Sequence, residues 1–257
     1  MSSLQCVLLF AFASVVAARI APAQVDTAHS VRSELSLAVG VAHTDRLDAT
    51  ASPIRFGGQG VDLAAHYRRA RGAMVVTASI DGGTRNLAPR ASSGSAGEQL
   101  TSGSAHVAAL HRLGGTPTGF AIGVDANASI DVTAHRYADA NASISDFLIG
   151  TFSLGPALWW DHRIAGGIAH AEVSAPLVGL VDHPYSDIRV ARISVRPVTA
   201  QNLHGFTGAI IYAPAAHRRV GIEYAYRFRV FGYSDVQPVR SASHALSVGV
   251  VTRFGAR

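Results

Sequence analysis

The sequence predicts an all-β fold, an antiparallel up-and-down transmembrane β-barrel of about ten strands. Three observations lead to this prediction. Apolar residues alternate with small or polar residues in one segment after another, which is the period of a β-strand with two unlike faces. Short and long connections follow one another in turn. Aromatic residues on the apolar face gather at the strand ends that adjoin the short connections.

The alternation itself supplies the strands. In the first one, Val31, Leu35 and Val39 share one face, while Arg32 and Glu34 share the other. The same pattern recurs to the end of the chain and predicts ten strands, near residues 31–41, 61–68, 74–80, 105–109, 119–130, 148–160, 171–177, 206–212, 220–230 and 246–254. A further strand pair around 188–195 would raise the number to twelve.

The connections between these strands alternate in length. The short ones fall at 69–72, 114–117, 161–163 and 213–218. The longer ones cover roughly 43–57, 81–102, 131–145, 181–204 and 233–241. Transmembrane β-barrels carry short turns at one end and longer loops at the other. Both ends of the barrel chain are therefore expected on the side of the short turns.

The start of the chain has the pattern of a secretory signal. Residues 7–18 form an apolar run that is too short to cross a bilayer as a helix. Ala21 and Ala23 then place small residues at the two positions that signal peptidase inspects. We therefore expect a cleaved signal peptide over 1–23 and a barrel domain over 24–257.

The composition differs from that of a water-exposed protein surface. Only 15% of the residues are charged, all 22 basic residues are arginine, and glutamate occurs only at Glu34, Glu98, Glu172 and Glu223. A soluble surface is usually rich in Lys and Glu. The only cysteine, Cys6, lies in the expected leader, so we expect the exported chain to form no disulfide.

Alternation alone fits a soluble β-sandwich as well as a membrane barrel, so the character of the two faces has to separate them. The apolar face carries aromatic residues beside the short connections, as in a girdle at a membrane interface. These residues are Tyr67, Phe120, Trp160, Tyr212 and Phe254. The opposite face is rich in Gly, Ala, Ser, Asp and Arg, which suits a narrow, crowded lumen. The membrane barrel is favoured, and a soluble exported β-protein that binds a small apolar ligand is an alternative.

The closing strand, residues 246–254, ends in the aromatic residue Phe254. With the leader, the alternating strands and the unequal loops, it resembles small bacterial outer-membrane β-barrel proteins over the whole exported chain. The resemblance implies a monomer in the bacterial outer membrane, in contact with its lipids and lipopolysaccharide. It also implies that the barrel-assembly machinery recognises the last strand, although this sequence departs from the family pattern with three residues, 255–257, after the aromatic. Such folds host many functions.

The face opposite the girdle carries charges near the short-turn end. Because charges in a low-dielectric lumen are expected to pair, the sequence predicts a salt-bridge network. Its members are Arg32, Glu34, His66, Arg68, Glu223 and Arg253. Side chains can fill a barrel of about ten strands, so we expect this network to block the lumen. A charged constriction that selects solutes is the alternative.

Asp and His residues in the long connections fit a hydrolase at the outer rim, but ordinary solvated loop residues are the favoured interpretation. They are Asp131, His135, Asp139, Asp182 and His183. Outer-membrane proteases of the omptin type use Asp and His there, but the sequence carries no matching motif. His170 and Glu172 share the lumen-facing register, and two ligands make a hydrogen-bonded pair more expected than a metal site.

The leading hypothesis is therefore a non-enzymatic outer-membrane barrel with a plugged or narrow lumen. We expect no catalytic residues, no metal and no cofactor. The arginines lie at turns and strand ends without interleaved aromatics, which argues against nucleic acid as a partner. Binding of ligands or surfaces is expected from the extracellular loops.

Overall fold

A computed structural model of the chain describes residues 32–49, 52–90, 97–114, 118–136, 146–164, 166–182, 195–214, 219–234 and 238–255. The expected signal peptide, 1–23, lies outside these residues. No helix within the described ranges is long and apolar enough to cross a membrane.

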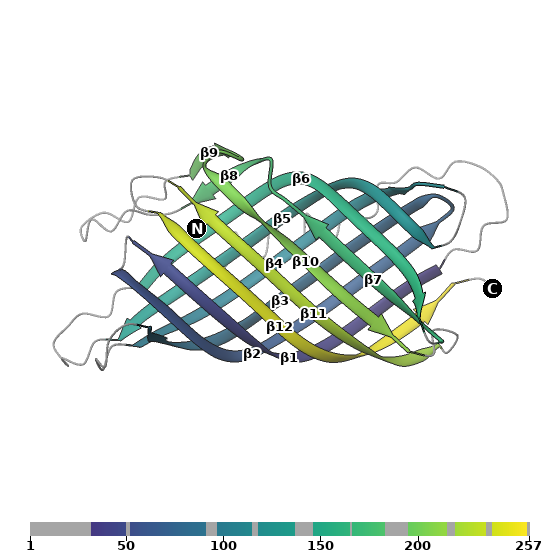
Figure 1. Cartoon of the computed structure of the whole chain (residues 1–257), viewed down its shortest axis with the longest axis horizontal. Helices are drawn as coiled ribbons and strands as arrows, with labels where there is room; N and C mark the ends of the chain where they lie inside the picture. Colours follow the sequence, from purple (N-terminus) through teal and green to yellow (C-terminus); the bar gives the residue numbers. More distant parts are fainter. Residues whose placement is uncertain are drawn as a thin grey trace, which may run out of the picture.

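In these ranges, twelve strands form one antiparallel sheet that is wrapped into a barrel, and they run obliquely to its long axis (Figure 1). They are β1 (Arg32–Asp48), β2 (Ser52–Arg71), β3 (Met74–Pro89), β4 (Gly97–Arg112), β5 (Gly119–Arg136), β6 (Asp146–Ile164), β7 (Gly167–Ser174), β8 (Val178–Asp182), β9 (Val195–Thr199), β10 (Leu203–Ala213), β11 (Val220–Tyr233) and β12 (Val239–Phe254).

The barrel wall has ten strand positions around its circumference, although it has twelve strands. We call each of these positions a stave. β1 pairs with both β2 and β12, and the pairing of β5 with β6 closes the sheet. β7 and β8 follow one another along β6, while β10 pairs with β7 and β9 pairs with β8. β7 and β8 together therefore form one stave in two pieces, and β9 and β10 together form another. The predicted fold, an all-β antiparallel up-and-down barrel of about ten strands, is confirmed.

The two faces of the wall are opposite to those of a soluble protein. On β1, the outward Leu37 and Val41 are 63% and 64% exposed, while Ser36 and Ala38 between them face the lumen and are buried. The same alternation continues around the barrel, as on β5, where Val124 is 65% exposed and Asp125 is buried. The outward apolar residues form a continuous belt, and the polar residues line the inside.

The strands extend farther from the short-turn end than the sequence predicted. The long connections expected over 43–57 and 81–102 are mostly strand, since β1 ends at Asp48, β2 begins at Ser52, β3 ends at Pro89 and β4 begins at Gly97. The sequence did not reveal these parts of the strands, because beyond the belt their outward face carries polar side chains such as the exposed Thr84. A strand that meets water on its outer face has no apolar alternation to reveal it.

One short turn was also predicted in the wrong place. The connection expected over 161–163 lies at 165–166, and β6 continues to Ile164. Asp161 and His162 are therefore strand residues, because this charged stretch simply continues the in-and-out alternation of β6. This shift moves Asp161 from a turn into the lumen, where it is 2% exposed.

Candidate functional site in the barrel lumen

Ionisable side chains fill the lumen at two levels, with a cavity between them. We call the group around Glu34 and Asp161, near the short-turn end, the inner cluster. We call the group around Arg46, near the opposite end, the outer cluster. The small lumen-facing residues of β1 and β12, among them Ala38, Gly40 and Ser247, leave space that these long side chains occupy.

Asp161 of β6 is one centre of the inner cluster. Its Oδ2 accepts hydrogen bonds from Arg68 Nη2 at 2.7 Å and from Arg112 Nη2 at 2.9 Å. Its Oδ1 accepts a hydrogen bond from Trp159 Nε1 at 2.5 Å and lies 2.5 Å from His170 Nδ1. One buried carboxylate thus joins partners from β2, β4 and β7 to its own strand.

Glu34 of β1 is the second centre. Arg32 Nη2 and Arg253 Nε each lie 3.1 Å from its Oε1, and Arg68 Nη1 lies 3.4 Å from its Oε2. His170 Nε2 lies 3.8 Å from the same Oε2. Because Arg68 and His170 each contact both carboxylates, the inner cluster is one network that ties β1, β2, β4, β6, β7 and β12 together.

The indole of Trp159 occupies the space beside this network. It is 1% exposed, and the Arg68 guanidinium lies 5.4 Å from the ring centroid. The His66 ring lies nearly parallel to it at 6.4 Å, and the His170 ring lies 5.4 Å away. An aromatic ring, a guanidinium and two imidazoles therefore fill the lumen at this level.

The structure brings four of the six predicted network residues together: Arg32, Glu34, Arg68 and Arg253. His66 lies against Trp159, and Glu223 is buried in the same lumen. Neither of these two forms an ion pair with another described residue. The sequence prediction missed Asp161, Arg112, Trp159 and His170 as members of the network. Their positions on the lumen-facing alternation of β4, β6 and β7 were the signal for them.

Arg46 of β1 is the centre of the outer cluster. Its guanidinium lies 3.1 Å from Asp48, 3.2 Å from Asp131 and 3.6 Å from Glu98, and its side chain is 1% exposed. Arg229 of β11 lies 3.5 Å from the other oxygen of Asp131. The outer cluster thus links β1, β4, β5 and β11.

The outer cluster corrects the predicted rim site. Asp131 is a lumen-facing residue of β5 and is 3% exposed, whereas the sequence placed it in a solvated loop. Asp182 ends β8. The side chain of His135, and Asp139 and His183 as a whole, lie outside the described residues. The Asp131 carboxylate forms ion pairs with Arg46 and Arg229 inside the lumen, so it does not lie at the rim where the hydrolase site was predicted.

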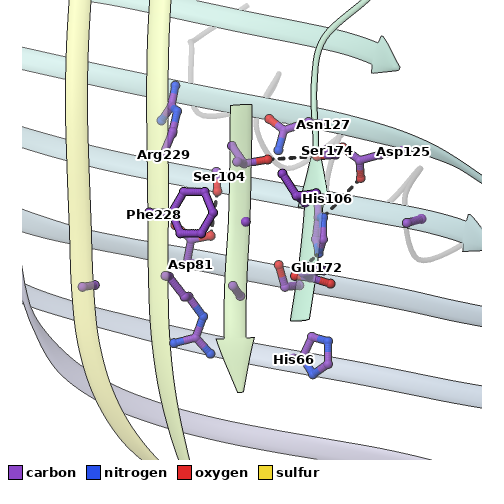
Figure 2. A pocket seen from close by; sticks show the side chains of 18 of the residues that line it. His66, Asp81, Ser104, His106, Asp125, Asn127, Glu172, Ser174, Phe228 and Arg229 are labelled. Carbon is purple, nitrogen blue, oxygen red and sulfur yellow. Dashed lines mark hydrogen bonds and ion pairs between the residues drawn. The ribbon is translucent and has the colours of Figure 1, made fainter. Parts of the chain in front are cut away.

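Between the clusters lies a polar cavity of about 100 Å³, with charged side chains pointing into it from several staves (Figure 2). His106 of β4 lies between two carboxylates, with Nδ1 3.2 Å from Asp125 and Nε2 3.7 Å from Glu172. Ser174 donates a hydrogen bond to Asp125 at 2.9 Å, and Ser104 donates one to Asp81 at 2.7 Å.

Ser174 and His106 in this cavity face carboxylates rather than each other. The Ser174 hydroxyl donates to Asp125, and the two ring nitrogens of His106 face Asp125 and Glu172, so these two residues do not form a nucleophile and base pair. His170 and Glu172 do not form the expected pair, because His170 is bonded to Asp161 and Glu172 lies near His106. In the described ranges, no three His, Cys, Asp or Glu side chains are grouped to hold a metal ion.

The predicted girdle residues face outward. Phe120 and Trp160 are cross-strand partners on β5 and β6, and their rings lie 6.2 Å apart. Tyr67, Tyr212 and Phe254 lie near the short-turn ends of β2, β10 and β12. Outward aromatic residues also occur farther along the staves. They include Phe206, Tyr226 and Phe228, so the aromatics are not confined to one edge.

The outward apolar belt, the aromatic residues on it and the charged lumen define the class of protein. This chain has the fold of an outer-membrane β-barrel protein. No protein-family model and no curated protein sequence matches it.

Among solved structures, the chain is similar to the outer membrane protease OmpT of Escherichia coli, with 9% identity, a TM-score of 0.48, and coverage of 90% of this chain and 99% of that one. It is also similar to the translocator domain of the autotransporter NalP of Neisseria meningitidis, with 11% identity, a TM-score of 0.45, and coverage of 97% and 96%. A third similar structure is the attachment invasion locus protein Ail of Yersinia pestis, with 12% identity and a TM-score of 0.36. The match covers 86% of this chain and 99% of that one. At such identities, no function passes from these proteins to this chain.

Proposed function

We propose that this chain is a non-enzymatic outer-membrane barrel that does not conduct along its axis and that holds a polar binding cavity between two charged plugs. The observation that carries the proposal is the inner cluster. It connects six of the ten staves through two buried carboxylates, and a fully buried tryptophan fills the space beside them. Side chains of this size fill the interior of a barrel of about ten strands.

Planar-bilayer conductance tests this proposal. We expect no steady single-channel current from the wild type. Replacing an ion pair in each cluster, Arg68→Ala with Asp161→Ala in the inner one and Arg46→Ala with Asp131→Ala in the outer one, removes four side chains without changing the net charge. With both plugs opened, a current should appear. The matched control replaces the pair Arg90 and Asp45, which lies on the exposed outer surface, and should stay silent. A steady current through the wild type would refute the closed lumen.

The belt supports the proposed location in the outer membrane, with lipids as partners. Beyond it, the exposed Arg55 and Arg240 lie on either side of Leu47 across three neighbouring strands. Arginines at this level suit the phosphates of lipopolysaccharide, since a guanidinium can bind phosphate through two hydrogen bonds. Heat-modifiable migration of the detergent-folded protein is the expected result. Solubility without detergent would favour the soluble β-protein instead.

The proposal leaves recognition of external partners to the outer connections. Three of these, 90–96, 137–145 and 183–194, lie almost wholly outside the described residues. The proposal also includes a monomer, and recognition of β12 by the barrel-assembly machinery through Phe254.

A further inference from the structure

One stave junction of the barrel wall is interrupted inside the apolar belt. β7 and β10 pair up to Ser174 and Thr207. The ladder resumes where Ala200 N–H donates to the carbonyl of Leu177, and it continues with Val178 opposite Thr199. Two residues on one side, 175–176, therefore face six on the other, 201–206. We call this interruption the wall break.

The residues at the wall break favour an interruption there. Pro176 has no N–H to donate to a ladder. Gly205 has a φ of +142°, and a Cβ at this residue would lie 2.1 Å from the carbonyl oxygen of Val230. Pro176 and Gly205 thus give the backbone a course that an ordinary ladder of L-residues does not take.

A second cavity, of about 40 Å³, lies at the wall break. Its lining includes lumen-facing side chains such as Asn127 and Arg229, and also outward ones such as Phe206 and Val230. Phe206 and Val230 are 44% and 39% exposed. The second cavity thus lies within the thickness of the wall, at the place where the ladder is interrupted.

The second cavity adjoins the polar cavity. Both share a set of lining residues, namely Asp125, Asn127, Ser174, Thr207 and Arg229. The outward surroundings of the wall break are apolar, with Leu154 and Leu177 46% and 58% exposed. The wall break thus lies between a charged interior and the lipid-facing surface, and both ends of the lumen are closed in the proposed function.

The polar cavity has hydrogen-bond donors to spare. Each carboxylate that lines it has a polar partner, as described for Asp81, Asp125 and Glu172, while Asp62 lies 3.0 Å from Arg85. Two arginine donors, Arg227 Nη2 and Arg85 Nε, are buried without a hydrogen-bond partner among the described residues. The ring nitrogens His66 Nε2 and His106 Nε2 and one carboxylate oxygen, Asp125 Oδ1, are buried in the same way. The two guanidinium donors favour an anionic head group.

We propose that the lumen binds a single-chain amphiphile through the wall break, with an anionic head group such as a carboxylate in the polar cavity and its alkyl chain in the bilayer. Arg229, which lines both cavities, lies where the head group would pass. To the proposed function, this inference adds a class of ligand and the route by which the ligand enters. It rests on the proposed function only in taking both ends of the lumen as closed, and the conductance experiment tests that closure separately.

Tryptophan quenching tests the proposal, because the chain has only two tryptophans and one of them, Trp159, lines the polar cavity. In the Trp160→Phe protein, reconstituted in vesicles of saturated phosphatidylcholine, Trp159 is the only tryptophan emitter. Dodecanoic acid brominated next to its carboxyl group should quench it saturably, since bromine quenches at contact range. Dodecanoic acid brominated at its methyl end should not quench it. No quenching by the first probe, or equal quenching by both, would overturn the proposal.

Variants in the same background test the route and the head group. Thr207→Leu narrows the junction of the two cavities and should raise the half-quenching concentration roughly tenfold or more, whereas Thr207→Val keeps the volume and should leave it unchanged. If Thr207→Leu does not fold by the heat-modifiability assay, Asn127→Leu replaces it. Unbrominated dodecanoate should displace the probe and dodecylamine should not. Unchanged quenching in the narrowed variant, or displacement by the amine, would overturn the route or the anionic head group respectively.

Discussion

Replacing Asp161 is the sharpest test of what holds the staves together. Its side chain is 3% exposed and contacts Arg68, Arg112, Trp159 and His170. Removing one member of a buried ion pair costs about 3–5 kcal/mol, because the other charge stays buried without compensation. Arg68 keeps Glu34 at 3.4 Å, so we expect Asp161→Ala to lower the free energy of unfolding by about 3–4 kcal/mol.

That loss raises the unfolding equilibrium constant by more than two orders of magnitude. Asp161→Asn keeps the shape and one acceptor oxygen, so the expected loss is smaller, about 1.5–3 kcal/mol. Reversible urea unfolding in short-chain phosphatidylcholine vesicles, followed by tryptophan fluorescence, measures both. The control, Asp45→Ala, breaks the exposed pair with Arg90 and should cost about 1 kcal/mol or less.

A double-mutant cycle separates the ion pair from general loss of packing. Asp161→Ala combined with Arg112→Ala should show a coupling energy of about 1–3 kcal/mol, as expected for contacting residues. The reasoning fails if Asp161→Ala costs no more than Asp45→Ala, or if the coupling with Arg112 lies below about 0.5 kcal/mol. Either result would mean that water screens the inner cluster and that the closed staves do not depend on it.

Two further predictions concern the faces of the wall and the wall break. In vesicles of brominated phosphatidylcholine, Trp159→Phe protein, which retains the outward Trp160, should be strongly quenched, and Trp160→Phe protein should not; the reverse order would invert the assigned faces. Gly205→Ala should destabilise the barrel by about 1–3 kcal/mol or more, because its φ of +142° and the nearby Val230 carbonyl exclude a side chain. Gly103→Ala, where a Cβ would meet only ordinary contacts at 3.7 and 3.9 Å, should unfold at nearly the wild-type urea concentration.

The sequence predicted the barrel because lipid on one side and a polar lumen on the other force strict alternation. The sequence did not reveal the parts of the strands that lie beyond the lipid, where the contrast between an apolar and a polar face ends. Beyond the belt, Gln59 and Thr84 face outward into water, so both faces of β2 and β3 are polar and resemble loop. The two-piece staves were also not predictable, because Pro176 and Gly205 suggest an interruption only when their strands are known to be neighbours.

The same limit applies to the lumen. Alternation assigns Trp159 and Asp161 to the inner face of β6, and it assigns Arg68 and Arg112 to the inner faces of β2 and β4. It does not say that β6 lies across the lumen from them. That follows from the stagger between staves and from closure of the barrel through β5 and β6. Members of a lumen network are therefore predictable one by one, while their partners require the structure.

The use of arginine explains how few side chains link the strands across the lumen. Arg68 contacts Glu34 and Asp161 on two different strands, and Arg46 contacts carboxylates on β1, β4 and β5. A guanidinium has five N–H donors in a fixed plane, so one residue can bridge several staves, whereas a lysine ammonium acts as a point charge. Each cluster thus links several strands of the wall, and in the proposed function it also closes the lumen. A wall braced at these two levels can tolerate an interrupted ladder between them, and the wall break lies beside the cavity that separates the clusters.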